Sequence, residues 1–113
     1  MSSWFIYIMS NKPNGVVYIG VTDNLEARVL EHKGMVYRKS FTAQYNCDKL
    51  VYFEELQNGL EATTREKQRK KWKRSWKINL INDINPDWMD ISLNWGNSVS
   101  SIYKTTRFLP TQE

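Results

Sequence analysis

The sequence predicts a small domain of the α/β class, of the α+β type, in which a short, mostly antiparallel sheet of three strands is flanked by helices. Two observations carry this prediction. Runs of β-branched and aromatic residues of strand length alternate with turn residues in the first half of the chain. Segments with a helical apolar period and cap residues follow those runs. The 113 residues correspond to one domain with one modest core, and the predicted order is β-β-α-β-α-α.

The first two strands form a predicted hairpin. The runs "WFIYIMS" (residues 4–10) and "VVYIGV" (residues 16–21) are joined by "NKPNG", whose proline, asparagine and glycine are typical turn residues. Side chains alternate between the two faces of a strand. Tyr7 and Tyr18, on neighbouring strands, are therefore able to face the same side of the sheet.

A helix is predicted directly after the hairpin. Asp23 followed by Glu26 forms an acidic version of the capping box and opens "NLEARVLEHK" (residues 24–33). Arg28 and His32 are four residues apart, so they lie one above the other on the helix surface. Residues 35–48 show no clear period and are expected to form a loop.

The second half contains a third strand and two helical segments. The strand is "KLVYFEE" (residues 49–55), and Asn58 with Glu61 caps a helix from about Leu60 to Arg74. The stretch "SWKINLINDI" (residues 75–84) continues with Trp76, Leu80 and Ile84 on one stripe. It ends at Asn85, because a residue before proline resists the α conformation. The domain is expected to span residues 1–93, including a capping segment at 87–93, and residues 94–113 to form a polar tail.

Composition excludes several classes of protein. The single Cys47 rules out a disulfide framework and a cysteine-rich zinc site, and fits a reducing cytoplasm. No disulfide-linked partner is expected. No apolar run approaches the roughly 20 residues of a membrane span, and the N-terminus lacks a basic secretory leader. The expected location is therefore the cytoplasm, with no membrane partner.

The positive charge is concentrated in one segment. Between Arg65 and Lys77, eight of thirteen residues are Lys or Arg and only Glu66 is acidic, so this segment carries +7 on a chain whose net charge is +4. A basic segment on a slightly acidic body is typical of a protein that binds a phosphate backbone. The alternative is a solvated helix face. Trp72 and Trp76 interleave with the cations and are interpreted as core anchors, with stacking on bases as the less favoured use.

Five polar residues form a candidate site for phosphodiester cleavage: Tyr7, Tyr18, Arg28, His32 and Glu66. A carboxylate can hold one hard divalent cation, and an arginine can clamp phosphate oxygens as charge develops on them. A tyrosine becomes a usable base when neighbouring cations depress its pKa.

Each of these residues also has a purely structural interpretation. Glu66 could form a helix salt bridge with Arg69 or Lys70, worth a few tenths of a kcal/mol. Strand tyrosines are more often packing residues, a single histidine is more often on a helix surface, and Arg28 could simply pair with Glu26 or Glu31. From the residues alone, the sequence supports a basic α/β domain with a possible nucleic-acid partner.

The motifs at these positions resemble the GIY-YIG nuclease superfamily, in particular its small stand-alone bacterial members. "FIY" (5–7) matches the first signature with Phe5 in place of glycine, and "YIG" (18–20) matches the second. "GVTDNLEARVLEHK" resembles the family's turn and first helix. "EATTREKQRKKWKRSWKINLINDINPDW" is similar to the subgroup's "REKQ…KKW…WK…LI…NP.W" run. The likeness covers roughly residues 4–92, and the segment after Leu93 lies outside it.

The resemblance implies a metal-dependent nuclease and a role for each matching residue. Glu66 is implied as the metal ligand, Arg28 as the phosphate-binding arginine, and Tyr7 and Tyr18 as the residues that position or activate water. His32 is implied as an auxiliary acid, base or phosphate contact. The family's late asparagine falls on Asn85, with Asn79 as a competitor, and Glu61 is a weaker rival to Glu66.

The predicted function is that of an endonuclease that hydrolyses DNA with Mg²⁺ or Mn²⁺. Single-stranded or structured DNA is the slightly favoured substrate, and DNA repair or recombination is the expected process. The alternatives are a non-catalytic DNA-binding module on the same scaffold and a protein whose basic helix docks an acidic partner. The residues expected to hold the DNA backbone without reading sequence are Lys67, Arg69, Lys70, Lys71, Lys73, Arg74 and Lys77.

Overall fold

A single antiparallel sheet forms the centre of the protein. The structure, a computed structural model, describes residues 3–35 and 38–94. Its strands are β1 (Trp4–Ser10), β2 (Val17–Thr22) and β3 (Lys49–Leu56), in the order β2-β1-β3. The central strand β1 pairs antiparallel with both neighbours, which confirms the predicted sheet. The predicted tail lies outside the described residues beyond Asn94.

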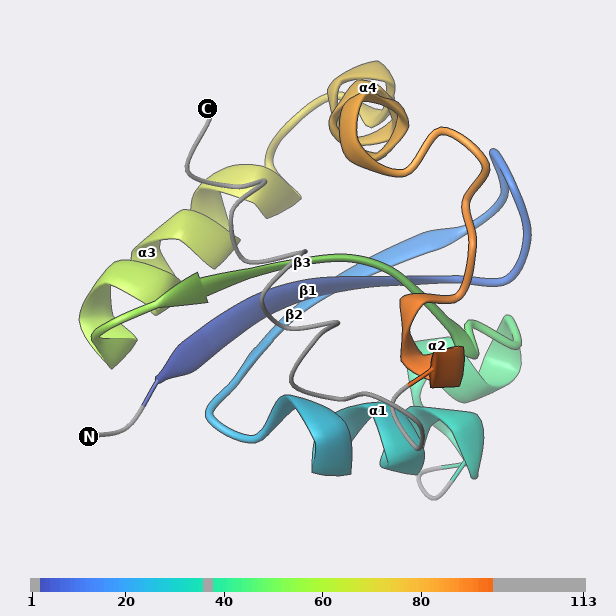
Figure 1. The fold of residues 1–113 in the computed structure, drawn as a ribbon, viewed down its shortest axis with the longest axis horizontal. Helices are drawn as coiled ribbons and strands as arrows, with labels where there is room; N and C mark the ends of the chain where they lie inside the picture. The colour runs from blue at the N-terminus through green and yellow to red at the C-terminus, as the bar shows by residue number, and fades with distance from the viewer. Residues whose placement is uncertain (1–2, 36–37, 95–113) are drawn as a thin grey trace.

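Helices cover both faces of the sheet. In Figure 1, α1 (Leu25–Lys33) and the short α2 (Phe41–Gln44) lie on one side, and α3 (Gly59–Lys70) and α4 (Arg74–Ile84) lie on the other. A turn of 3-10 helix, η1 (Ile91–Asn94), follows. Within the described ranges, no helix has both the length and the apolar character needed to cross a bilayer.

The alternation of side chains along β1 divides the core into two clusters, one on each face. Burial of each large apolar side chain contributes about 1.5–3 kcal/mol, so both faces of the sheet stabilise the fold. The cluster beneath α1 contains Tyr7, Met9, Leu25, Val29, Cys47, Leu50 and Phe53. The cluster beneath α4 contains Ile6, Ile8, Ile19, Val51, Tyr52, Ile81 and Trp88.

The helix caps differ from prediction at one position. Asn24, and not Asp23, caps α1, because its side-chain oxygen accepts a hydrogen bond from the backbone N–H of Ala27 at 3.2 Å. The cap of α3 is confirmed: the Asn58 side chain accepts from the backbone N–H of Glu61 at 2.7 Å. Both amides satisfy N–H groups that a helix start leaves without a partner.

The segment 35–48, predicted as a loop, contains the one-turn helix α2. The Ser40 side chain caps it by accepting from the backbone N–H of Ala43 at 3.3 Å. The turn is too short to show an apolar period, which is why the pattern missed it.

The first basic helix ends earlier than predicted, at Lys70, and Arg74 begins α4. The Arg74 guanidinium donates to the backbone carbonyls of Asn14 and Gly15 at 2.7 and 2.5 Å. These hydrogen bonds tie the start of α4 to the hairpin turn.

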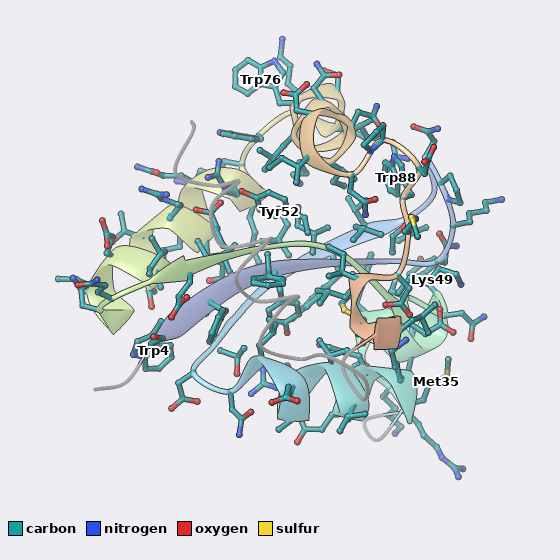
Figure 2. All side chains as sticks on the ribbon, viewed as in Figure 1. Trp4, Met35, Lys49, Tyr52, Trp76 and Trp88 are labelled. Carbon is teal, nitrogen blue, oxygen red and sulfur yellow. The ribbon has the colours of Figure 1, made fainter. Side chains whose placement is uncertain are left out.

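The stripe of Trp76, Leu80 and Ile84 was predicted to face the core, and this prediction is wrong for Trp76. Trp76 is 52% exposed, whereas Ile81 is fully buried against the sheet. Figure 2 shows Trp76 on the outer side of α4, away from the sheet. It packs edge-on against Trp72, with ring centroids 6.0 Å apart.

Candidate active site

Tyr7 lies across the neighbouring strand at Gly20, its partner in the β1–β2 register. A Cβ added at Gly20 would lie 2.4 Å from the Tyr7 hydroxyl oxygen and 2.5 Å from Cζ. Real Cβ atoms do not approach so closely, so only glycine leaves room for the phenol. The glycine of the "YIG" motif therefore has a steric role that the sequence pattern does not reveal.

Replacing Gly20 with alanine is expected to lower the cleavage rate by about 100-fold, because a displacement of roughly 1 Å at a reacting group has that effect. Rates on DNA with Mg²⁺ and circular dichroism of the variant would test this. Gly59→Ala is the control, since its added Cβ meets the Trp4 ring, at 3.0 Å, and not a site residue. Full activity in a folded Gly20→Ala protein would contradict the steric role.

His32 is held between two hydroxyl groups. Its Nε2 lies 2.9 Å from the Tyr7 hydroxyl, and its Nδ1 lies 2.9 Å from the Thr42 hydroxyl. Thr42 is buried on α2 and lies 3.2 Å from the Ser40 hydroxyl. These contacts fix the plane of the imidazole ring. Sequence reasoning missed Thr42; the serine before "FTAQ" was the available signal for a helix start there.

Tyr18 completes an aromatic wall around this group. Its ring centroid is 6.3 Å from that of Tyr7 and 5.6 Å from that of His32. Phe41 of α2 packs against its other side, at 6.0 Å. The Nζ atom of Lys70 lies 5.8 Å from the centre of the Tyr18 ring, which brings α3 to the site.

Burial determines the protonation state of the central pair. Desolvation, with a smaller contribution from Tyr18, raises the pKa of Tyr7 far above its ordinary value, and Arg28 offsets this only in part. Arg28 thus lowers the pKa of this tyrosine as expected, but burial outweighs it, so the expected net depression of the pKa is wrong. Desolvation and the charge of Arg28 lower the pKa of His32. At pH 7 a neutral phenol thus faces a neutral imidazole that can accept its proton.

The cleavage rate is expected to fall on acidification with a midpoint below 6.5, the ordinary histidine value. A lowered pKa keeps the imidazole neutral down to that midpoint, and protonation below it removes the acceptor for the Tyr7 proton. A pH–rate profile at fixed Mg²⁺ would test this. His32 is the chain's only histidine, so His32→Gln should give a slower rate without that acid limb. A midpoint above 6.5 in the wild type would contradict the assignment.

Arg28 and Glu66 bring opposite charges to the same phenol. Arg28, which is partly exposed, lies close enough to Tyr7 to lower the pKa of its phenol, and it pairs through Nε with Glu31 at 3.1 Å. The side chain of Glu66 is 14% exposed and pairs with Lys70 at 3.2 Å. Its charge is close enough to raise the pKa of Tyr7.

The structure thus brings the other four predicted site residues near the Tyr7 side chain: His32 by a hydrogen bond, Tyr18 by ring packing, and Arg28 and Glu66 through their charges. The salt bridges of the structural interpretation are also present, between Arg28 and Glu31 and between Glu66 and Lys70. The rival carboxylate, Glu61, is exposed in the first turn of α3, one full turn and more before Glu66.

Glu66 is the predicted carboxylate ligand for a divalent cation at this site, while the nearby Glu31 carboxylate is paired with Arg28. Over residues 3–35 and 38–94, no group of three or more His, Cys, Asp or Glu side chains is arranged to hold a metal. Mg²⁺ is commonly bound through one or two carboxylates, several waters and the phosphates of a substrate. Glu66 fits that kind of open site and does not fit a closed one.

Two arginines of the basic segment have a structural role. Glu54 of β3 is fully buried and accepts from Arg65 Nη1 at 2.8 Å, Arg69 Nη2 at 2.7 Å and the Tyr52 hydroxyl at 2.6 Å. The Arg69 side chain is only 7% exposed. Its predicted use as a DNA contact is therefore wrong, because a buried carboxylate needs this charge.

The other cations of the segment remain nearer the surface. Arg74 is held by the hairpin carbonyls, and Lys77 donates to the backbone carbonyl of Lys70 at 3.3 Å. The exposed members of the predicted DNA-binding set are Lys67, Lys70, Lys71, Lys73 and Arg74.

The structure does not bring the predicted asparagine to this site. Asn85 ends α4, and its side-chain amide donates to the carbonyls of Val51 and Met89 at 3.0 and 2.9 Å. It ties the segment after α4 to the edge of β3. Asn79, also on α4, lies with Trp72 and Trp76, and within the described residues no contact joins either asparagine to the Tyr7 cluster.

Comparison with known proteins agrees with this geometry. The model described as the GIY-YIG catalytic domain matches residues 3–79. The UPF0213 protein CPE1444 of Clostridium perfringens is 39% identical over 77 residues, 68% of this chain and 81% of that protein. A UPF0213 protein of Syntrophus aciditrophicus is 34% identical over 89 residues, 79% of this chain and 100% of that protein. No solved structure gives a significant match. With its family model, its small bacterial relatives and its Tyr7 cluster in agreement, the chain belongs to the GIY-YIG family.

Proposed function

We propose that the protein is an endonuclease that hydrolyses DNA phosphodiester bonds with a divalent metal, Mg²⁺ or Mn²⁺. The observation that carries this proposal is the 2.9 Å contact between the Tyr7 hydroxyl and His32 Nε2, beside Arg28 and Glu66. A neutral acceptor, a cation and a carboxylate around one hydroxyl are the groups that hydrolysis of a phosphodiester needs.

In the proposed reaction a water molecule attacks phosphorus in line. The water gives its proton to the Tyr7 oxygen while Tyr7 gives its own proton to His32 Nε2. Thr42 accepts from the Nδ1–H of His32 and so keeps Nε2 free of hydrogen before the step. Tyr18 bounds the site and helps to place the water.

Arg28 binds the non-bridging oxygens of the phosphate, since a guanidinium can contact two of them at once. Glu66 would hold the divalent cation, which when bound would polarise the phosphate and stabilise the departing 3′ oxygen. Lys70, the ion-pair partner of Glu66, is exposed and would contact the DNA.

The exposed lysines of the basic segment would hold the flanking DNA backbone without reading sequence. The fold offers little surface for extended duplex contacts, so single-stranded or structured DNA is the favoured substrate, with DNA repair as the setting. We also propose residues 1–93 as the nuclease domain. The one cysteine, Cys47, is a buried thiol, in keeping with a cytoplasmic location.

A non-catalytic DNA-binding module is the second candidate. The observation that favours it is the Glu66–Lys70 ion pair, in which the proposed metal ligand already has a cationic partner. Such a module would bind DNA with a steep salt dependence and produce no cuts.

An assay on end-labelled single-stranded, duplex and branched DNA separates the two candidates. We expect cuts with Mg²⁺ or Mn²⁺ that EDTA abolishes, and the fastest cutting on single-stranded or branched substrates. Salt-dependent binding without cuts under any metal would establish the binding module in place of the enzyme.

A further inference from the structure

A second surface lies outside the Tyr7 cluster, where α3 ends and α4 begins. It is a cleft of about 290 Å³ lined by Trp72, Trp76, Asn79, Leu80 and Asp83. Its volume is at the lower end of the roughly 300–1,000 Å³ of small-molecule sites. The cleft therefore suits one planar ring system.

The two tryptophans differ in exposure: the Trp72 ring is packed against Arg69, and the Trp76 ring is open to solvent. The Arg69 guanidinium carbon lies 4.6 Å from the centre of the Trp72 ring, and Trp76 packs edge-on against that ring at 82°. Because Arg69 is itself held by buried Glu54, the Trp72 indole has little freedom. Trp76 is half exposed and labelled at the outer surface in Figure 2. An exposed aromatic platform of this kind stacks on bases of any sequence.

The polar lining selects between a base and a phosphate. Asn79 and Asp83 are four residues apart on α4, so they lie one above the other beside the tryptophans. Across the described ranges, neither side chain hydrogen-bonds or pairs with another residue. A carboxylate repels phosphate but accepts from an exocyclic amine, as carboxylates do with cytosine N4.

The surrounding charge matches a nucleic-acid backbone. Lys71 and Lys73 are exposed on either side of Trp72 in the chain. Lys70, two residues before Trp72, reaches the Tyr18 ring of the active site. A strand bound at the Tyr7 cluster could therefore continue along these lysines to the cleft.

We propose that the Trp72–Trp76 cleft binds one unpaired nucleobase of the substrate strand, stacked on Trp76, with preference for a base that carries an exocyclic amine. This inference rests on the proposed DNA substrate and adds a base-binding site to it. A duplex cannot present an unpaired base, so the cleft would also explain a preference for single-stranded or branched DNA.

Fluorescence anisotropy with labelled strands of about 12 nucleotides would test the inference. The strands are oligo-dC, oligo-dT and an abasic backbone with the same phosphates, and EDTA prevents cleavage. We expect Trp76→Ala to weaken oligo-dC binding by about 5- to 160-fold, which corresponds to the roughly 1–3 kcal/mol of one stacked base, and to leave abasic binding unchanged. Trp76→Phe should retain most of the affinity. Leu60→Ala, which removes an exposed apolar side chain near the start of α3, should change nothing.

The preference for a base with an exocyclic amine is tested by comparing the affinities for oligo-dC and oligo-dT. The wild type should bind oligo-dC more tightly than oligo-dT, and Asp83→Ala should remove that difference. Equal binding of all three strands by the wild type would overturn the base site while leaving the nuclease proposal intact. An equal loss of affinity for all three strands in Trp76→Ala would also overturn it. So would a Trp76→Ala protein that has lost thermal stability but binds the strands as tightly as the wild type, because Trp76 would then be covered by the protein itself. Failure of the wild type to bind any strand would refute the DNA substrate as well.

Discussion

Glu66→Gln protein is expected to bind DNA and not to cut it. The amide retains the size and polarity of the side chain but loses the charge that would hold a divalent cation. Metal stabilisation of the phosphate contributes several kcal/mol to such reactions, so the rate should fall by about 10³-fold or more. Lys70 loses its ion-pair partner in this variant, so the affinity for DNA should be equal to or slightly above that of the wild type.

The rival carboxylate on the same helix supplies the matched control. Glu61→Gln changes an exposed residue in the first turn of α3 and leaves the Asn58 cap intact, because that cap uses the backbone N–H. It should cut at the wild-type rate. The decisive comparison is single-turnover cleavage and DNA affinity for both variants. Normal cutting by Glu66→Gln, or a selective loss in Glu61→Gln, would refute the ligand assignment.

Glu54→Ala is expected to remove most of the free energy of unfolding. Removing one partner from a buried ion pair costs about 3–5 kcal/mol, because the remaining charge is buried without compensation. Domains have only about 5–15 kcal/mol of stability in total. Arg69 would bear most of this cost, since its side chain is buried whereas that of Arg65 reaches solvent.

Urea unfolding of three variants would isolate the cause. Asp48→Asn disrupts the exposed Asp48–Lys49 pair and should cost less than about 1 kcal/mol. Glu54→Leu combined with Arg69→Met replaces the buried charges by apolar groups of similar size and should recover much of the stability lost in Glu54→Ala. If Glu54→Ala unfolds at the wild-type urea concentration, the buried network does not stabilise the fold.

The parts of the fold that the sequence predicts are those set by local patterns. The hairpin follows from β-branched runs around a proline–glycine turn, and alternation along β1 assigns each side chain to its face. The helical spacing of Arg28 and His32 places both on the side of α1 that reaches Tyr7. Local periodicity is enough for these residues because their neighbours are close in the chain or directly across a strand pair.

The parts that it does not predict depend on contacts between distant segments. The sequence places Glu54 in the third strand and predicts Arg69 as a DNA contact, yet the two pair across 15 residues of chain in the interior. The direction of the Tyr7 pKa shift depends on burial that only the packed structure reveals. Trp76 shares the helical period of a core residue but falls on the outer side of α4.

The contact between Arg74 and the hairpin turn affects the order in which segments of the nascent chain fold. The guanidinium reaches carbonyls 59 and 60 residues earlier in the chain, and β1 receives its second neighbour only when β3 is made. A chain emerging from the ribosome N-terminus first can form the hairpin early, but contacts this far apart in sequence close late. Tyr7 and Tyr18 are thus synthesised long before α3 can dock beside them, so the cluster around the Tyr7 side chain stays incomplete until the segment that carries Glu66 has left the ribosome.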